Sequence, residues 1–284
     1  MRKIVSIFES KPTMEGAGVR LRRFFGNNDI PKFDPFLLLD HFGSDDPNDY
    51  IKGFPWHPHR GIETVTYMIR GQVEHGDSIG NSGVINSGDV QWMTAGSGIL
   101  HQEMPKPFVG NMMGFQLWVN LPREKKMTEP RYLGLTKNDF ESLEVDGNKI
   151  IVIAGIYHGV KGPVRDLFVD TDYFDVHLNG EFNHFTDKRT CFILVYDGFV
   201  NIANERLTGG YCGLLEQEGN VQIKGNGNFI LVAGDPLNEP ISWGGPIVMN
   251  TQEELDNAFL ELKNGNFIKG KSPRARKVHE ESSM

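Results

Sequence analysis

FPWHPHRGIETVTYMIRGQVEHG, residues 54–76, contains two histidines separated by a single proline and followed by β-branched and aromatic residues. In an extended segment, residues i and i+2 point to the same face. We therefore expect His57 and His59 to project side by side, and Glu63 to face the same way if no bulge intervenes. An isolated pair of this kind is either the beginning of a metal site or an ordinary polar surface.

A second stretch, GDVQWMTAGSGILHQEMP, residues 88–105, ends in a similar pair formed by His101 and Glu103. Its apolar residues predict short strands on either side of a glycine turn at residues 96–98. The chain thus carries two H-x-[HE] pairs on strand-like segments. Two antiparallel strands of a small barrel can bring the four side chains together inside it, so the combination is more specific than either pair alone.

The composition indicates a soluble globular protein of one large or two ordinary domains, with 284 residues and 39% hydrophobic residues. The 33 glycines and 15 prolines are scattered as turn signals, which favours many short strands. A formal net charge of −8 argues against nucleic-acid binding through a basic surface. We interpret the basic residues of Lys269–Lys277 as a solvated tail.

The two cysteines, Cys191 and Cys212, match no zinc or redox spacing, and they favour a reducing, cytoplasmic setting. The first residues, MRKIVSIFESKPTMEG, lack the sustained apolar core of a signal peptide. No apolar run is long enough to cross a membrane as a helix, so we expect no membrane partner.

Strand-like segments fall into two groups, separated by a linker-like stretch at residues 121–135. Within CFILVYDGFVNI, the pair Asp197 and Gly198 predicts a hairpin turn between two strands. The spacing favours barrels or sandwiches over alternating strands and helices. The predicted strands are residues 18–25, 63–69, 90–93 and 114–119 in the first group, and 149–154, 174–178, 190–196, 221–223 and 229–233 in the second.

One helix is predicted near the end of the chain, in NTQEELDNAFLELKNG. Thr251 and Glu254 have the spacing of a capping box at its start. Gly265 is well placed to end it. An apolar stripe lies between them, formed by Leu255, Ala258, Phe259 and Leu262.

The two histidine-containing stretches resemble the first and second motifs of the cupin superfamily, and the chain up to about residue 270 resembles the pirins, a two-cupin family. The segments that carry this resemblance are LLLDHFG (37–43), FPWHPHRGIETVTY (54–67), QWMTAGSGILHQEMP (91–105), FQLWVNLP (115–122) and GGPIVMNT (244–251).

The resemblance implies an all-β bicupin: two stacked cupin β-barrels with a short C-terminal helix. Residues 1–135 would form the N-terminal, metal-binding cupin domain and residues 136–250 a C-terminal cupin domain without metal. Residues 251–284 would form the helix and tail. We expect apolar side chains to fill the second barrel, among them Phe192, Leu194, Phe229 and Leu231.

By resemblance, the metal ligands are His57, His59, His101 and Glu103, the set that the spacing also brings together. Iron(II) is the implied metal, while Mn, Cu, Ni, Co or Zn are alternatives because such a ligand set discriminates poorly among them. Glu103 is also the expected catalytic proton acceptor. We interpret Glu63 as an outer residue that orients a histidine or pairs with a cation such as Arg60.

A cavity for a flat aromatic substrate is expected beside the metal. For Met113 and Trp118 a place in the barrel core is an equal alternative. His75 can approach the barrel mouth, or it can be a plain polar turn residue. The candidate lining residues are Phe54, Trp56, His75, Met113, Gln116 and Trp118.

Two functions from different classes remain open, because neither follows from a fold alone. The first is a quercetin 2,3-dioxygenase-like oxidoreductase, that is, a metal-dependent enzyme that cleaves a flavonol with dioxygen. The second is an iron-containing, redox-responsive regulatory protein that binds a transcription factor or a metabolic enzyme.

Overall fold

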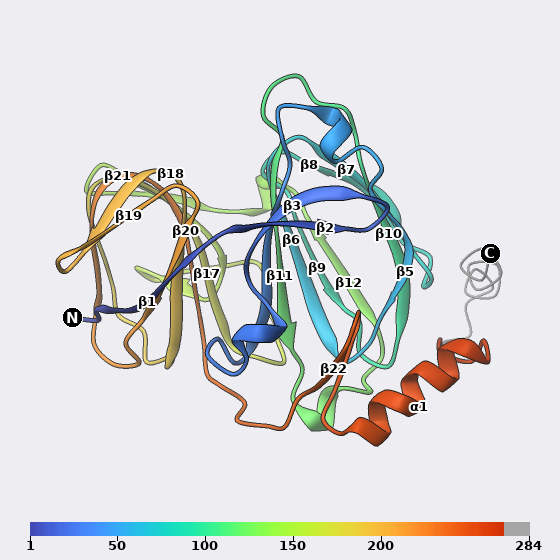
Figure 1. Ribbon diagram of the computed structural model, residues 1–284. Coiled ribbons are helices and arrows are strands. Elements are labelled where there is room, and N and C mark those ends of the chain that lie inside the picture. The colour runs from blue at the N-terminus through green and yellow to red at the C-terminus, as the bar shows by residue number, and fades with distance from the viewer. Residues whose placement is uncertain (270–284) are drawn as a thin grey trace. The chain divides into compact units, whose positions relative to one another are not determined.

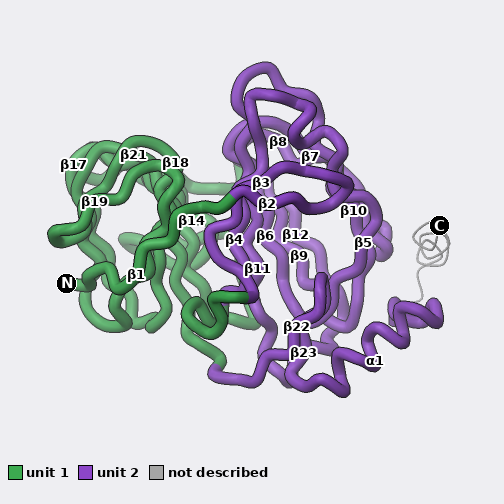
Figure 2. Tube along the Cα trace, viewed as in Figure 1, with its two compact units in different colours: residues 1–11, 28–35, 138–237 green, residues 12–27, 36–137, 238–284 purple. Residues whose placement is uncertain are grey.

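A computed structural model describes residues 1–269 of the chain (Figure 1). The predicted basic tail, from residue 270 onward, lies outside the described residues. The all-β class is confirmed, since strands dominate and one α-helix is present among the described residues. The chain divides into two compact units, each assembled from several segments (Figure 2). Unit 1 comprises residues 1–11, 28–35 and 138–237, and unit 2 comprises residues 12–27, 36–137 and those from 238 onward.

Unit 2 contains two antiparallel sheets that face each other across an apolar core. That core joins residues of both sheets, such as Leu21 and Met68 from one and Val73 and Ile85 from the other. The larger sheet has the order β12 (Arg131–Leu135), β9 (Val90–Thr94), β6 (Ile62–Arg70), β11 (Met113–Asn120), β4 (Phe36–Phe42), β3 (Val19–Phe25) and β2 (Lys11–Glu15). The smaller has the order β5 (Phe54–His59), β10 (Ile99–Pro105), β7 (Gln72–Asp77) and β8 (Ser82–Asn86).

The stretch predicted to be a linker, residues 121–135, is only partly one. Its last five residues form β12, which pairs with β9 in the larger sheet, with Tyr132 opposite Met93. The polar residues that precede this strand conceal it, because its own apolar run is short and half-buried at the edge of a sheet.

Unit 1 contains one strongly curved sheet around a second apolar core. In the sheet order, its strands are β1 (Ile4–Glu9), β20 (Tyr211–Leu215), β18 (Thr190–Ile202), β21 (Val221–Gly234), β17 (Thr171–His184), β14 (Asn148–Ala154) and β13 (Ser142–Val145), with β19 (Glu205–Thr208) also paired to β18. A small hairpin, β15 (Ile156–Tyr157) with β16 (Val160–Lys161), lies outside this sheet.

Four residues were predicted to fill the core that the sheet of unit 1 encloses. Two of them lie on the enclosed face and two lie on the other face of the sheet. Phe229 and Leu231 belong to the cluster that the sheet encloses. Phe192 and Leu194 are also fully buried, but the enclosed cluster contains their neighbours in β18 instead. Because successive residues of a strand alternate between faces, these two lie on the opposite side. There Phe192 packs edge-on against Phe33, with ring centroids 5.6 Å apart.

The predicted hairpin at Asp197 and Gly198 is wrong, because β18 runs through this point as one strand. Its pairing with β21 continues on both sides of a register shift between Val195 and Asp197. Gly198 has φ +66°, and a Cβ at this position would collide with the carbonyl group of Asn226. The turn-like residues therefore make a bulge that bends the strand, not a reversal of the chain.

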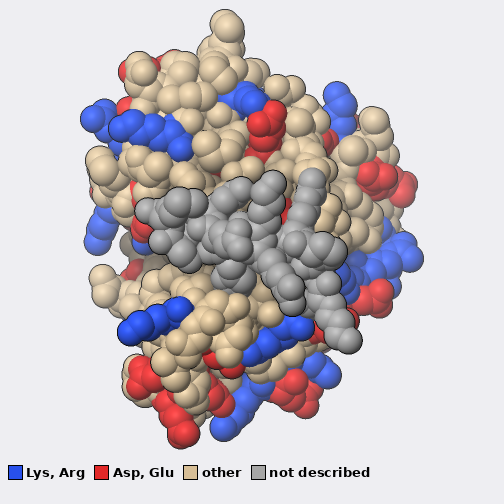
Figure 3. Space-filling model, turned by 90° about the vertical axis from the view of Figure 1, so that its right-hand side faces the viewer, with Lys and Arg blue, Asp and Glu red and all other residues tan. Residues whose placement is uncertain are grey.

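The C-terminal part of unit 2 contains the hairpin of β22 (Ser242–Gly244) and β23 (Ile247–Met249), followed by α1 (Gln252–Lys263). The predicted capping box of α1 is confirmed, since Thr251 and Glu254 exchange both hydrogen bonds. Leu255 and Ala258 bury the helix against Ile247 and Phe267. No helix among residues 1–269 is long and apolar enough to span a membrane. On the face shown in Figure 3, acidic and basic side chains are interspersed.

Replacing Phe229 by Ala should lower the free energy of unfolding by about 3–5 kcal/mol, because the ring is fully buried in the core of unit 1. Urea unfolding followed by far-UV circular dichroism measures this loss. All four tryptophans lie in unit 2, so their fluorescence would miss it. Phe185→Ala is the matched control, since Phe185 is 73% exposed in the same unit. Equal losses in the two variants would contradict the assignment of this core.

Candidate metal centre and cavity

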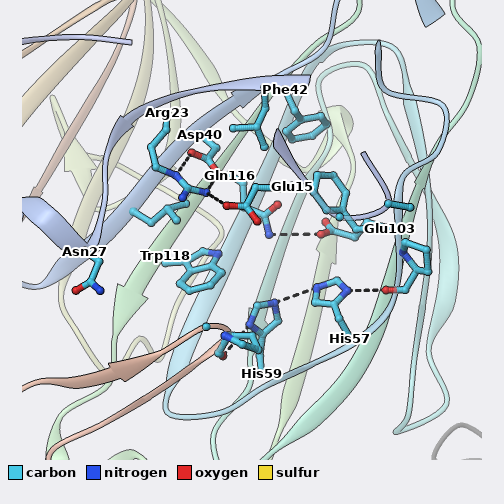
Figure 4. A pocket seen from close by; sticks show the side chains of 18 of the residues that line it. Glu15, Arg23, Asn27, Asp40, Phe42, His57, His59, Glu103, Gln116 and Trp118 are labelled. Carbon is cyan, nitrogen blue, oxygen red and sulfur yellow. Dashed lines mark hydrogen bonds and ion pairs between the residues drawn. The ribbon is translucent and has the colours of Figure 1, made fainter. Parts of the chain in front are cut away.

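Three histidines from two neighbouring strands meet in unit 2. His57 and His59 come from β5 and His101 from β10, and His57 lies directly opposite His101 in the antiparallel register. Each ring offers one nitrogen atom as a possible metal ligand, and these three nitrogen atoms all lie within 4.8 Å of one another. The spacing correctly predicts that His57 and His59 project side by side, since their Nε2 atoms are 3.2 Å apart (Figure 4).

Hydrogen bonds fix the tautomers of two of these rings. Nδ1 of His57 lies 2.8 Å from the carbonyl oxygen of Pro55, and Nδ1 of His59 lies 3.1 Å from that of Pro246. A carbonyl oxygen only accepts, so both Nδ1 atoms must carry hydrogen. Both Nε2 atoms therefore present lone pairs to each other. A cation between them relieves this repulsion, so the residues fit a metal ion.

His101 supports the same conclusion. Both of its ring nitrogens are buried and have no hydrogen-bond partner among the described residues. Buried polar atoms are rarely left without a partner, and such an exception calls for a ligand. Burial lowers the pKa of His57, His59 and His101, so all three rings are neutral, the form in which imidazole binds a metal.

Glu103 lies two residues beyond His101 on β10 and faces the same cavity as His57 and His59 (Figure 4). Its Oε1 accepts a hydrogen bond of 2.9 Å from the hydroxyl group of Thr66, and its Oε2 a longer one of 3.4 Å from Nε2 of Gln116. The tight cluster of potential ligand atoms is limited to the three histidines. The carboxylate is therefore held near the centre by two side chains of the larger sheet.

Glu63 does not face the histidines. It pairs with a cation as expected, but the cation is Arg131, whose Nη2 lies 3.9 Å from Oε1 of Glu63, and not Arg60. The chain turns at Gly61, which has φ +77°, and this breaks the parity that the sequence suggested. Glu63 is buried on the opposite face of β6 from Thr66. It accepts hydrogen bonds from Trp92 Nε1 at 3.0 Å and from Thr94 Oγ1 at 2.6 Å. These bonds join β6 to β9 on that face of the sheet.

His75 and Met113 also lie elsewhere than in the cavity lining. His75 is not in a turn but in the middle of β7, buried, with its ring stacked on Tyr132 at 4.7 Å between centroids. Its Nε2 lies 3.6 Å from Oδ2 of Asp77. Met113 is buried at the start of β11.

A cavity of about 610 Å³ opens beside the histidines. This size suits a small-molecule ligand. Five aromatic side chains line it, namely Phe42, Phe54, Trp56, Trp118 and Trp243, and its polar lining includes Glu15, Arg23, Asp40, Glu103 and Gln116. Phe54, Trp56, Gln116 and Trp118 were expected from the sequence. Asp40 was not expected in the lining. The signal that could have identified it is a charged residue inside the apolar run FLLLDHF.

Comparison with known proteins identifies the family. Residues 18–119 match the Pirin family model, and residues 173–268 match the Pirin C-terminal cupin domain. A pirin-like protein of Caulobacter vibrioides is 42% identical, over 94% of this chain and 99% of its own. Pirin of Homo sapiens is 38% identical, over 93% of each chain. The chain belongs to the pirin family.

A solved structure extends the likeness. It is described as quercetin 2,3-dioxygenase from Acinetobacter baumannii, and it superposes with a TM-score of 0.87 at 34% identity, covering 94% of this chain and 98% of its own. The resemblance to pirins and the two-cupin fold that it implied are therefore confirmed.

In this pirin-family chain the C-terminal segment completes the centre. Pro246 supplies the carbonyl group that orients His59, and Trp243 lines the cavity. Arg60, next to His59, holds this segment in place. Its guanidinium forms an ion pair of 2.8 Å with Glu261 and donates to the carbonyl oxygen of Phe267 at 2.9 Å. Sequence reasoning could not find these partners, since Pro246 lies 187 residues beyond His59 and Phe267 lies 207 residues beyond Arg60.

Lys126 adds a second clamp at the same place. Its buried Nζ donates to the carbonyl oxygens of Gly61 and Val248 and to Oδ1 of Asn120, at 2.9, 3.0 and 2.7 Å. Burial lowers the pKa of this lysine to about 7, while Glu239 and Glu254 favour its charged form. The side chain of Lys126 thus fixes the turn that follows β5 to β23.

Replacing His101 by Ala should remove most of the bound metal and leave the chain folded. The ring makes no hydrogen bond among the described residues, so the substitution takes away a ligand atom without stranding a partner. Elemental analysis of the purified protein, beside its circular dichroism spectrum, measures both effects. His177→Ala is the control, because His177 is a half-exposed histidine of unit 1. A His101→Ala protein with full metal occupancy would refute the site.

Proposed function

We propose that this chain is a metal-dependent dioxygenase that cleaves flavonols such as quercetin. The observation that carries the proposal is the opening of a cavity with aromatic walls directly onto neutral histidines whose lone pairs converge. A flat, electron-rich ligand stacks well on such walls. The name of the structural relative from Acinetobacter baumannii, quercetin 2,3-dioxygenase, supports the same substrate class.

In this proposal one metal ion is held by His57, His59, His101 and Glu103. Iron(II) is our choice of metal, although Mn, Cu, Ni, Co and Zn also suit nitrogen and carboxylate donors. A bound divalent ion would supply Lewis acidity that favours the deprotonated form of the flavonol. An ion that accepts six ligands would keep open positions beside these four side chains, as catalysis requires.

The side chains of the chain then have distinct tasks. Trp118 and Phe42 keep the ligand flat, and their apolar surfaces exclude water from the cavity. Glu103 accepts the proton of the 3-hydroxyl group at Oε2, because Oε1 is already engaged by Thr66 at 2.9 Å while Gln116 is 3.4 Å from Oε2. Dioxygen adds across the heterocycle of the flavonol, and the products are a depside and carbon monoxide.

We also propose that the protein works in the reducing environment of the cytoplasm. Cys191 and Cys212 are both buried as free thiols. Burial raises the pKa of Cys191 to about 12, so this thiol stays protonated and unreactive.

Quercetin added without oxygen should bind the metal-loaded protein and shift its own absorbance without turnover. Admitting oxygen should then consume it and release carbon monoxide in equal amount. Glu103→Gln should slow turnover by about 10²–10⁴-fold, the usual contribution of a general base. The amide retains a weak ligand oxygen but cannot accept the proton.

Glu74→Gln is the control, since Glu74 lies on the neighbouring strand β7 with a half-exposed side chain paired to Lys106. Equal turnover in wild type and Glu103→Gln would indicate incidental metal-catalysed oxidation. That result would reject the enzyme and leave the regulatory function, in which the oxidation state of the metal changes the affinity for a protein partner.

A further inference from the structure

We propose that Arg23, Asp40 and Glu15 form a subsite that binds phenolic hydroxyl groups on the part of the ligand remote from the metal centre. This inference rests on the proposed flavonol substrate and specifies which flavonols the cavity prefers. The three residues line the cavity together with the histidines. Figure 4 shows the pair of Arg23 and Asp40 at the other end of the lining from His57 and His59.

The subsite belongs to one polar row across the inner face of the larger sheet. The registers place Arg23 opposite Asp40, Asp40 opposite Gln116, and Gln116 opposite Thr66. Directly opposed residues of antiparallel strands point to the same side, with Cβ atoms about 5 Å apart. The row ends at Glu103, which accepts hydrogen bonds from both Thr66 and Gln116. The candidate catalytic carboxylate and the subsite therefore share one rigid support.

The subsite itself is fixed by a two-pronged ion pair. Nε and Nη2 of Arg23 donate to the two oxygens of Asp40, each at 2.8 Å, and Nη2 also lies 3.0 Å from Oε1 of Glu15. The side chain of Asp40 is only 8% exposed, and burial raises the pKa of its carboxyl group. A pair of apolar residues would stabilise the fold as well as a buried ion pair does. The presence of an ion pair in the cavity wall therefore points to ligand recognition.

The pair, which lines the cavity, retains unused hydrogen-bonding capacity. Nη1 of Arg23 makes no hydrogen bond within residues 1–269, although it carries two N–H groups. Each oxygen of Asp40 accepts one hydrogen bond from Arg23 and keeps a further lone pair. Donors and acceptors thus lie side by side. A phenolic hydroxyl group, which both donates and accepts, matches this arrangement, and two adjacent ones match it best.

The charge of the subsite argues against an anionic ligand. Two carboxylates surround one guanidinium, so the local balance is negative. A carboxylate or phosphate group would be repelled, whereas a neutral phenol would be bound.

The spacing of the lining residues along β11 suits a flavonol that bridges both ends of the lining. The ring of His59 packs edge-on against Trp118, with centroids 5.0 Å apart. Trp118 lies two residues along β11 from Gln116, the neighbour of Asp40, which corresponds to about 7 Å along the strand. A flavonol whose chelating oxygens face the histidines would extend its pendant phenyl ring past Trp118 and direct the hydroxyl groups of that ring toward Arg23 and Asp40.

Quercetin and galangin test the subsite, because galangin lacks both hydroxyl groups on the pendant ring and is otherwise identical. Anaerobic titration of the metal-loaded protein, followed by absorbance, gives Kd for each. We expect wild type to bind quercetin about tenfold more tightly than galangin, as one or two net hydrogen bonds would give. Arg23→Gln and Asp40→Asn should bring this ratio close to one by weakening quercetin alone.

Arg20→Gln is the matched control and should retain the wild-type ratio. Arg20 lies on the same strand, but its side chain is 72% exposed and pairs with Asp49. If a variant fails to fold, the ratio of the galangin and quercetin Kd values in wild type still decides. Kaempferol has one hydroxyl group on the pendant ring, and its Kd should lie between those of the other two flavonols. Equal Kd values for quercetin and galangin in wild type would overturn the subsite alone. Failure of both flavonols to bind would overturn the proposed function as well.

Discussion

Two carbonyl oxygens determine what the histidines of unit 2 can do. By accepting the Nδ1 hydrogens of His57 and His59, the carbonyl groups of Pro55 and Pro246 turn both Nε2 lone pairs toward one point. Without these bonds each ring could rotate or change tautomer, and a ligand geometry would have to be created anew at each binding event. One carbonyl group is two residues away along the chain, and the other comes from a distant segment. Arg60 and Lys126 hold that segment in place.

The long-range bond explains why buried charged residues surround the turn after β5. Arg60 reaches Glu261 and Phe267, and Lys126 reaches Val248, so side-chain donors fix both the hairpin that carries Pro246 and the segment that follows it. Such bonds are stronger than neutral ones, and they satisfy the carbonyl oxygens that they reach. They cost desolvation energy, which an apolar contact would not require. Their advantage is direction: they fix the position of one carbonyl oxygen against one imidazole.

The sequence predicts local features of this protein well and distant ones poorly, for physical reasons. The histidine pairs and the capping box of α1 depend on spacing within one strand or one helical turn, so the pattern alone locates them. Asp197 and Gly198 have the residue types of a hairpin, but the same types also form a bulge, and only the partner strand β21 decides between them. Glu63 changes face because one glycine turns the chain. No local sequence pattern indicates that Trp243 lines the cavity.

The two units use the same antiparallel architecture for opposite purposes. In unit 1 the enclosed space is filled with apolar side chains, and the result is a core. In unit 2 the inner face of the larger sheet bears a row from Arg23 to Thr66 that would be expensive to bury in a core. Arg23 pairs with Asp40, and Thr66 and Gln116 both donate to Glu103, so the expense is limited to the desolvation that these bonds do not recover. A fold that accepts this loss of stability gains a set of fixed donors and acceptors facing a cavity. Departures from apolar filling therefore mark the part of the chain where the candidate site lies.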